Sequence, residues 1–331
     1  MSHQSSGRAR LEAFFKVFQS DDRVLIVISA DPDAMASAAA VKRLLWRKVS
    51  QVAVASVNQV KRPDNLHLLE ILKLKMDSLA SIDPGDYQRL VMVDSQPHHS
   101  PETELLSFDL VIDHHPSAPL YPGRQPAFAD IRPELGATAT MMAGYLRAAK
   151  IRPNPRLATA LFYAIKTDTQ NFVRQGQLED MKAFRRLYPL VHLPLLSDIE
   201  RAPIARSSFK NIVSGLGGAV FAKNSAHSFL GRTDHADTLV MVADFLMKIK
   251  GVNRAVAAGL AGDKLVIILR AGGLRQDVGQ LAQRAFGELG SAGGHKNMAR
   301  AEIPLKHLEV KIRNNLQAIN RFVLRRLSDA K

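Results

Sequence analysis

The sequence predicts an α/β fold with a mostly parallel sheet in the N-terminal domain, a second, smaller α/β domain, and a cleft between them. Apolar runs of strand length alternate with helical patterns along the first half of the chain, which is typical of parallel sheets. The alternation stops near residue 190 and resumes after residue 207. Since 331 residues suffice for two domains, we expect domains at residues 1–190 and 208–331, joined by a linker at residues 191–207.

The strands of the N-terminal domain are predicted from short runs of mostly apolar residues. Residues 24–28 lack the alternation of a half-exposed strand, so we expect this strand to be buried on both faces of a sheet. Further strands are predicted at residues 52–57, 89–93 and 110–112, and helices at residues 35–46, 66–74, 136–150, 155–165 and 179–187.

The C-terminal domain repeats the alternation. Strands are predicted at residues 226–230, 254–260 and 264–270, and helices at residues 238–249, 276–286 and 308–327. A glycine-rich turn is predicted at residues 291–295, between the last two helices. The final helix is basic and amphipathic, which would allow a homodimer to form through it.

Composition indicates a globular protein, with 46% apolar and 23% charged residues. Cysteine is absent, which fits a reducing compartment and excludes thiolate metal sites. We find no apolar run of the roughly 20 residues that span a bilayer and no apolar core of a secretory signal in residues 1–10. We therefore expect a cytoplasmic protein without a membrane partner. The net charge of +14 would attract polyanions, but it is equally consistent with charge spread over solvated helices.

Acidic residues follow several of the predicted strands. Asp31 and Asp33 follow the first strand, Asp94 follows residues 89–93, and Asp113-His114-His115 follows residues 110–112. Ligands of parallel sheets bind at the carboxyl ends of the strands. A single aspartate there is often a helix cap, but caps do not explain two adjacent histidines. Because carboxylates and imidazoles together suit divalent ions such as Mn²⁺, or Mg²⁺ where oxygen ligands dominate, we predict a metal site.

The motifs around these residues resemble those of the DHH phosphoesterase superfamily over nearly the whole chain. The resemblance is closest to the bifunctional nanoRNase and adenosine bisphosphate phosphatase branch, because of the two-domain length and Thr167-Asp168-Thr169. The turn Gly293-Gly294-His295 and the strand-end Arg270 are similar to the DHH-associated C-terminal domain. The motifs that carry the match are Ser29 to Ser37, Val93-Asp94, Asp113 to Pro116, Thr167 to Phe172 and Gly293-Gly294-His295.

The resemblance implies a role for each matched residue. Asp94 would bridge two ions and His115 would face the scissile phosphate, so these two are the expected catalytic residues. Asp31 would bind the first ion, and the other ligands would bind the second. The implied metal ligands are Asp31, Asp33, Asp94, His114 and Asp168, and the implied substrate-binding residues of the second domain are Arg270, Gly293, Gly294 and His295.

The first motif departs from the family pattern. Ser29 and Val27 stand where branches of the family have a histidine or aspartate that binds metal. The first ion would then be weakly held, held by another ligand such as His98 or His99, or absent. Two ions or a single ion are therefore both compatible with the sequence.

The expected function is that of a hydrolase acting on ester bonds. A metal-activated water would cleave phosphodiester or phosphomonoester bonds of short oligoribonucleotides or small nucleotides. The partners would be short RNA, a nucleotide or another phosphorylated small substrate, and cyclic dinucleotides form a further class. Two alternatives stay open: a nucleotide-binding or scaffold protein that has lost turnover, which Ser29 favours, and an inorganic polyphosphate hydrolase.

Overall fold

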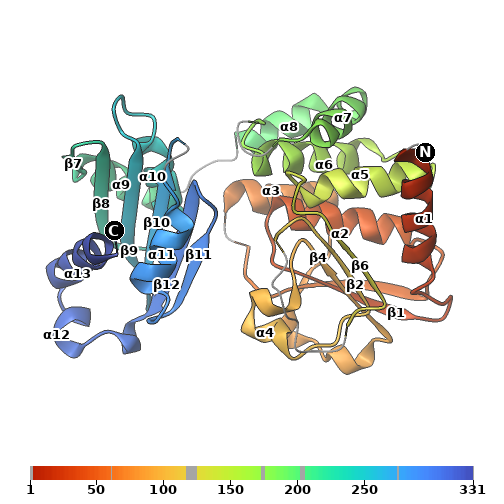
Figure 1. Cartoon of the computed structure of the whole chain (residues 1–331), viewed down its shortest axis with the longest axis horizontal. Coiled ribbons are helices and arrows are strands. Elements are labelled where there is room, and N and C mark those ends of the chain that lie inside the picture. The colour runs from red at the N-terminus through yellow and green to blue at the C-terminus, as the bar shows by residue number, and fades with distance from the viewer. Residues whose placement is uncertain are drawn as a thin grey trace. The chain divides into compact units, whose positions relative to one another are not determined.

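The computed structural model describes residues 3–60, 62–116, 125–172, 176–201, 206–273 and 276–330. The chain divides into two compact units, Met1–Pro203 and Ile204–Lys331. In Figure 1 the first unit runs from red to green and the second ends in blue. Both units consist of a sheet with helices packed against it, which confirms the predicted α/β class.

The first unit contains a six-stranded sheet with the order β3-β2-β1-β4-β5-β6, in which every pair is parallel. Alternate residues of β1 enter different cores: Ile26 lies in the larger core beneath the helices, and Val27 lies in the smaller core on the other face. This confirms the strand buried on both faces. The strands are β1 (Arg23–Ile28), β2 (Gln51–Ser56), β3 (Asp77–Ser78), β4 (Arg89–Val93), β5 (Leu110–Asp113) and β6 (Phe128–Ile131).

Prolines in the first turn begin several helices of the first unit, because a proline there loses no helical hydrogen bond. Asp31 and Asn154 cap α2 and α6 with their side chains. The large core lies between the sheet and α2, α5 and α6. The helices are α1 (His3–Phe15), α2 (Pro32–Leu44), α3 (Pro63–Leu72), α4 (Pro101–Glu104), α5 (Thr138–Ala148), α6 (Pro155–Asp168), α7 (Leu178–Leu187) and α8 (Leu193–Glu200).

The second unit contains a mixed sheet with the order β11-β12-β10-β9-β8-β7, in which β8 and β9 are parallel and the other pairs are antiparallel. Helices α11 and α13 pack on one face of this sheet, and α9 and α10 pack on the other. The elements are α9 (Arg206–Gly217), β7 (Val220–Ala222), β8 (Ser225–Thr233), α10 (Asp237–Leu246), β9 (Arg254–Ala261), β10 (Lys264–Ala271), α11 (Val278–Phe286), β11 (Ser291–Gly294), β12 (Met298–Pro304), α12 (Val310–Arg313) and α13 (Leu316–Asp329).

Three predicted segments differ in the structure. The linker predicted at residues 191–207 contains α8, because Pro194 begins a helix whose Leu196 and Ile199 are buried. The helix predicted at residues 308–327 is interrupted, since Asn315 caps a new helix by accepting a hydrogen bond from the backbone of Ala318. The glycine turn is an edge strand, β11, that pairs with β12. None of the described helices has both the length and the apolar character that crossing a membrane requires.

Candidate functional site

Three strand ends come together at one edge of the first sheet. β1 pairs with β4 and β4 pairs with β5, all in parallel, so their carboxyl ends are neighbours. Asp94 directly follows β4 and His114 directly follows β5. Asp33 lies in the first turn of α2, in the loop region after β1, and Asp168 is the last residue of α6.

Four of the predicted ligands converge at this edge. The ligand atoms of Asp33, His114 and Asp168 lie within 4.8 Å of one another, and those of Asp94, His114 and His115 form a second such group. His114 Nε2 lies 3.0 Å from Asp168 Oδ2 and 3.7 Å from Asp94 Oδ1. Carboxylate oxygens and imidazole nitrogens at this spacing are suitable ligands for Mn²⁺ or a similar divalent ion. The donor set therefore fits the predicted metal.

Asp33 and Asp94 hold protons more tightly than ordinary aspartates. Burial, together with the charges of Asp33 and Asp31, raises the pKa of Asp94 well above its usual value. Burial and the charge of Asp168 raise the pKa of Asp33 to about 7. Burial would lower the pKa of His114, but its hydrogen bond to Asp168 raises the pKa to about 9. The site thus concentrates negative charge that protons, or a bound cation, must balance.

The first turn of α5 positions two of the carboxylates. The backbone N–H groups of Thr138 and Ala139 donate hydrogen bonds to the two oxygens of Asp33, at 2.6 and 2.7 Å. The hydroxyl of Thr138 donates to Asp94 Oδ1 at 2.7 Å. Sequence reasoning missed this contribution. The available signal was Gly136, where a Cβ would lie 2.6 Å from Thr169 Cγ2, so only glycine allows this close approach.

Asp113 orients His115. Asp113 is fully buried, and its Oδ1 lies 2.8 Å from His115 Nδ1. The side-chain amide of Gln96 donates to Asp113 Oδ2 at 2.7 Å. Burial would raise the pKa of Asp113, but the hydrogen bonds from His115 and Gln96 lower it below its usual value. An ionised Asp113 accepts a hydrogen bond from His115 Nδ1 and so holds the His115 proton on that atom. The other ring nitrogen, Nε2, is then the atom that would contact a substrate.

The backbone at Asp94 is unusual. Its φ of +59° lies in the left-handed region, which few side chains other than those of Asn and Asp adopt readily. The Asp94 N–H donates to Ile112 O at 2.9 Å, which continues the pairing of β4 with β5 for one residue. Strained residues of this kind gather at functional sites, where the surrounding structure holds them in place.

The residues of the first motif lie at the margin of this cluster. Asp31 is exposed, its Oδ1 accepts a hydrogen bond from Ala34 N, and it belongs to neither group of described ligand atoms. Ser29 is exposed as well. Val27 is buried in the core on the opposite face of the sheet and supplies no metal ligand.

The histidines predicted as replacement ligands are also peripheral. His98 and His99 lie in the 3₁₀ turn Pro97–His99, and among the described residues neither belongs to the metal-binding groups. The His99 ring lies 5.7 Å from the His115 ring, and its Nδ1 accepts a hydrogen bond from Gln96 N. Burial lowers the pKa of His99 to about 4, so this ring is neutral at pH 7.

The predicted substrate residues of the second unit have structural partners. Arg270, near the end of β10, donates from Nε to Asp244 Oδ1 at 2.6 Å. Gly293 and Gly294 end β11, and His295 follows. Gly294 has a φ of +140°, and a Cβ there would lie 2.3 Å from the carbonyl oxygen of Met298. The fold therefore requires this glycine, and the role of all four residues in binding substrate stays a prediction.

Comparisons with known proteins agree with this architecture. An uncharacterized protein of Methanocaldococcus jannaschii is 32% identical over 283 residues, which are 85% of this chain and 58% of that protein. The chain thus spans little more than half the length of this relative.

Two solved structures share the fold. An exopolyphosphatase-related protein from Bacteroides fragilis matches with 17% identity and a TM-score of 0.72, over 98% of each chain. RecJ from Thermus thermophilus, in complex with Mn²⁺, matches with 14% identity and a TM-score of 0.52, over 99% of this chain and 54% of that one. The model of the DHH family, N-terminal domain, matches residues 23–165. These residues contain β1 to β6 and three of the four clustered ligands, Asp33, Asp94 and His114. The first unit is therefore similar, over residues 23–165, to the N-terminal domain of the DHH family.

Proposed function

We propose that this protein is a metal-dependent phosphohydrolase that cleaves phosphodiester or phosphomonoester bonds of short oligoribonucleotides or small nucleotides. One observation carries the proposal: Asp33, Asp94, His114 and Asp168 converge from three strand ends and one helix end. Purely structural carboxylates are normally paired with cationic side chains or separated, because clustering them underneath the surface costs free energy. A cluster that the fold maintains in spite of this cost is typical of a metal centre.

The chain's own residues have distinct parts in this chemistry. Asp33, Asp94, His114 and Asp168 would hold the metal, and Asp31 lies near enough for its charge to act on Asp94. Bound divalent ions supply Lewis-acid stabilisation of phosphoryl oxygens and lower the pKa of a water molecule. Thr138 holds the Asp94 carboxylate in one orientation through its hydroxyl.

His115 is suited to act on the phosphate itself. With its proton fixed on Nδ1 by Asp113, its Nε2 can accept a hydrogen bond or, in the protonated ring, donate one to a phosphoryl or leaving-group oxygen. Gln96 donates a hydrogen bond of 2.7 Å to Asp113, and Asp113 in turn orients the His115 ring.

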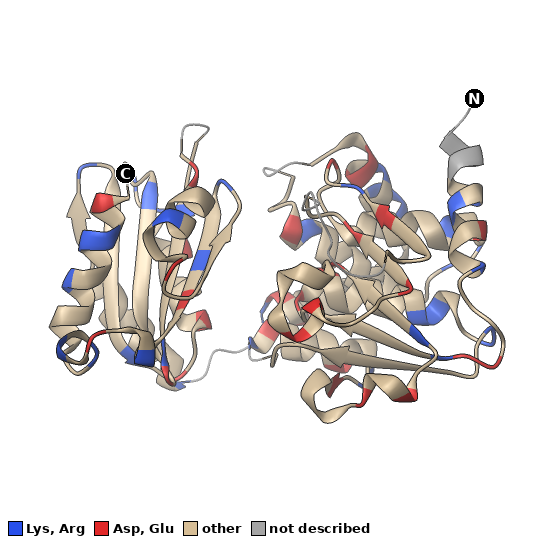
Figure 2. Ribbon diagram, turned by 60° about the horizontal axis from the view of Figure 1, so that its bottom comes forward, with Lys and Arg blue, Asp and Glu red and all other residues tan. Residues whose placement is uncertain are grey.

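The charge of the second unit supports an anionic substrate. Ile204–Lys331 contains 20 Lys and Arg residues but only nine Asp and Glu residues, a net charge of +11. Figure 2 shows these cations on its helices and strands. A surface of this charge attracts phosphates over a distance of about one Debye length, ~8–10 Å at physiological salt. The two-domain length and Thr167-Asp168-Thr169 support the nanoRNase and adenosine bisphosphate phosphatase branch as the detailed assignment.

A second candidate is a protein that binds nucleotides without turning them over. Ser29, exposed beside the cluster, supplies no carboxylate or imidazole where family branches have a metal ligand. One ion rather than two would then be bound, through Asp33, His114 and Asp168. Inorganic polyphosphate is a third possible substrate, since the B. fragilis protein with this fold is described as exopolyphosphatase-related.

A substrate panel tests these candidates. The full chain would be incubated with Mn²⁺ or Mg²⁺ and, in separate reactions, an RNA dinucleotide, 3′-phosphoadenosine 5′-phosphate or inorganic polyphosphate. We expect turnover of at least one of the two nucleotide substrates, loss of turnover in Asp94→Asn and His115→Ala, and normal turnover in Asp86→Asn. Asp86 is exposed and precedes β4, whereas Asp94 follows the opposite end of that strand. Nucleotide binding without product would favour the second candidate, and phosphate release from polyphosphate alone would favour the third. A protein that binds neither metal would contradict the proposal.

A further inference from the structure

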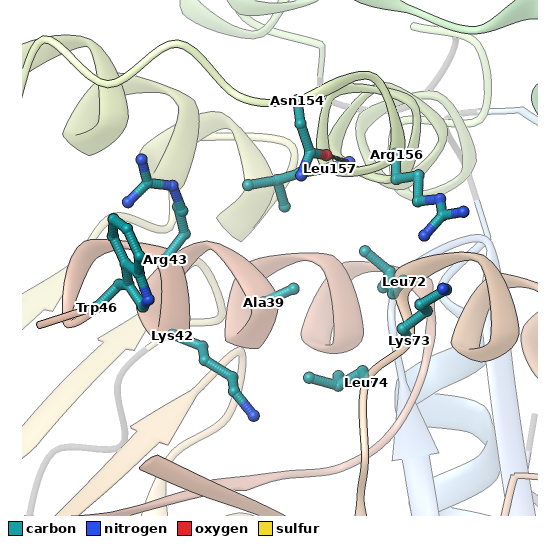
Figure 3. Close-up of a pocket in the computed structure, with 10 residues that line it drawn as sticks. All are labelled: Ala39, Lys42, Arg43, Trp46, Leu72, Lys73, Leu74, Asn154, Arg156 and Leu157. Carbon is teal, nitrogen blue, oxygen red and sulfur yellow. Dashed lines mark hydrogen bonds between the residues drawn. The ribbon is translucent and has the colours of Figure 1, made fainter. Parts of the chain in front are cut away.

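A pocket lies in the first unit, away from the acidic cluster. It has a volume of about 410 Å³ and lies between the C-terminal end of α2, the end of α3 and the first turn of α6. Figure 3 shows Lys73 and Arg156 at one end of this hollow and Trp46 with Arg43 at the other. Its volume is within the usual range for small-molecule sites, roughly 300–1,000 Å³.

The charge of this pocket is entirely positive. Its described lining residues include the cations Lys42, Arg43, Lys73 and Arg156 and no carboxylate. None of the four forms an ion pair with a described residue. Nearby cations do find partners: Arg62 pairs with Asp64 at 2.7 Å. Four unneutralised cations around one hollow repel one another, and an anion bound there would relieve that repulsion.

Lys73 lies at the C-terminal end of α3 and lines the pocket. This residue ends α3 with a φ of +50°, in the left-handed conformation that glycine usually supplies at helix ends. A lysine adopts this conformation less readily than glycine, although Lys150 and Lys223 adopt it as well. The fold directs the Lys73 side chain to the pocket, opposite Arg156 (Figure 3).

The remaining walls suit a phosphate and a planar ring. Arg156 lies in the first turn of α6, a 14-residue helix whose positive end favours anions. At the other end, 57% of the Trp46 surface is exposed although the guanidinium groups of Arg43 and Arg47 lie 5.1 and 4.4 Å from its ring centre. Indole rings exposed beside arginines are common stacking surfaces for nucleobases.

We propose that this pocket binds a free nucleoside mono- or diphosphate, with its phosphate at Lys73 and Arg156 and its base against Trp46. The pocket is distinct from the metal centre although the same helices join them. Lys42 follows Asp33 by nine residues of α2, roughly 14 Å, and Arg156 precedes Asp168 by twelve residues of α6, roughly 18 Å. Nothing in this inference depends on the hydrolase proposal.

Trp46 is the chain's one tryptophan, so its fluorescence reports on this pocket alone. The full chain would be titrated in EDTA with ADP, AMP, adenosine, inorganic phosphate and an RNA dinucleotide. We expect a saturable fluorescence change with ADP or AMP, and weaker binding of adenosine and phosphate. Lys73→Gln and Arg156→Gln should each raise the Kd for ADP at least about tenfold, because each removes a charge-assisted hydrogen bond to phosphate.

Three further variants test whether ADP binds at this pocket and not elsewhere on the protein. Lys75→Gln, which removes an exposed lysine outside the pocket, should leave the Kd unchanged. Asp94→Asn, at the metal centre, should also leave it unchanged. Trp46→Phe should abolish the fluorescence signal, while calorimetry should show weakened ADP binding and unchanged phosphate binding.

Other results would overturn the inference. Absence of both a fluorescence change and calorimetric heat at millimolar ADP would show that no such site exists. Equal losses in Lys75→Gln and Lys73→Gln would show general attraction to a basic surface. Loss of binding in Asp94→Asn would place the ligand at the metal centre, and a dinucleotide that binds more tightly than ADP would identify RNA, not a free nucleotide, as the ligand.

Discussion

The two units of this protein use charge in opposite ways. The first unit, Met1–Pro203, has 25 Lys and Arg against 22 Asp and Glu, a net charge of +3, whereas the second has a net charge of +11. Every buried carboxylate among the described residues nevertheless lies in the first unit: Asp22, Asp33, Asp94, Asp113, Asp130 and Asp180. Hence the first unit has little net charge but strong local fields, and the second has a large net positive charge without a buried carboxylate among its described residues.

The different burial of charged side chains explains why the charges of the two units differ in their effects on stability and on metal binding. Exposed cations are screened by salt and contribute little to stability individually, so the second unit can carry many of them. Buried carboxylates interact strongly and must be hydrogen-bonded or neutralised. Asp130 illustrates the structural solution, since Arg132 and Tyr145 donate hydrogen bonds to it at 2.5 to 2.9 Å. Among the described residues, Asp33 and Asp94 are grouped with the imidazoles of His114 and His115 and not with an arginine, which leaves them suited to a metal.

The largest expected effect comes from Asp94→Asn. Asparagine tolerates the left-handed backbone and can still accept the Thr138 hydrogen bond, so the fold should be retained. Turnover should fall by about a thousandfold or more, since the developing phosphate charge loses its stabilisation. The raised pKa of Asp94 means that its ionised form destabilises the metal-free fold at pH 7. The metal-free variant should therefore melt a few degrees higher than the wild type.

Thermal melts with and without Mn²⁺ check this prediction. The wild type should gain stability on adding Mn²⁺, and the variant should gain much less. Equal Mn²⁺-induced shifts in both proteins, or wild-type turnover in the variant, would show that Asp94 is not part of the metal centre and that the first unit's buried charge is structural.

The pH dependence of metal binding should be the next largest effect. In the metal-free protein the pKa of His114 is about 9 and that of Asp33 about 7, and both groups must be deprotonated to bind a cation. Mn²⁺ affinity should therefore rise with pH, by up to about tenfold per unit between pH 7 and 9, and more steeply below pH 7. Calorimetry in buffers of different ionisation enthalpy should detect about one proton released per ion at pH 8. Binding without proton release would contradict the pairing of His114 with Asp168.

The position of the clustered ligands could be predicted from the sequence because the strands of a parallel sheet all have their carboxyl ends at one edge. Mostly apolar runs such as residues 89–93, alternating with helical patterns, predict strands of a parallel sheet, and the residues that follow these strands then lie at the same edge. Asp94 and His114 could be placed together on that basis alone. The predicted convergence required no knowledge of side-chain contacts.

The contacts that complete the centre could not be predicted in this way. Asp33 binds the backbone of Thr138 across 105 residues, and Gln96 binds Asp113 across 17. Such pairs depend on how α5 and the loop after β4 pack, which local patterns do not encode. In the second unit, Ser291–Gly294 has little strand propensity, and it forms β11 only because β12 offers an edge to pair with.

Arg270 tests whether the second unit's charge has a specific role. Arg270→Gln should raise the KM for a nucleotide substrate roughly tenfold to a hundredfold, the usual cost of a charged hydrogen bond, with the Mn²⁺-induced shift in melting temperature unchanged. Asp244→Asn is the matched control, since it removes the partner that lies 2.6 Å from Arg270 Nε. If Arg270 binds substrate, Asp244→Asn should leave KM the same or lower it. Equal increases in KM in both variants would show that the ion pair matters only for the shape of the second unit.

The smallest expected effects are those of alanine substitutions at Gly293 and Gly294 of β11. They distinguish a role of these glycines in packing from a role in binding substrate. Gly294→Ala should lower the free energy of unfolding of the second unit by about 1–3 kcal/mol, because its Cβ would collide with Met298 O at 2.3 Å. A Cβ on Gly293 would meet only Gln283 Oε1, at 3.8 Å, so Gly293→Ala should change stability by about 0.5 kcal/mol or less. Urea unfolding measures both. If phosphate approaches this strand, Gly293→Ala should still raise KM several-fold by blocking that approach. An unchanged KM in the stable Gly293→Ala variant would assign both glycines to the packing of β11 and leave Arg270 as the predicted phosphate contact.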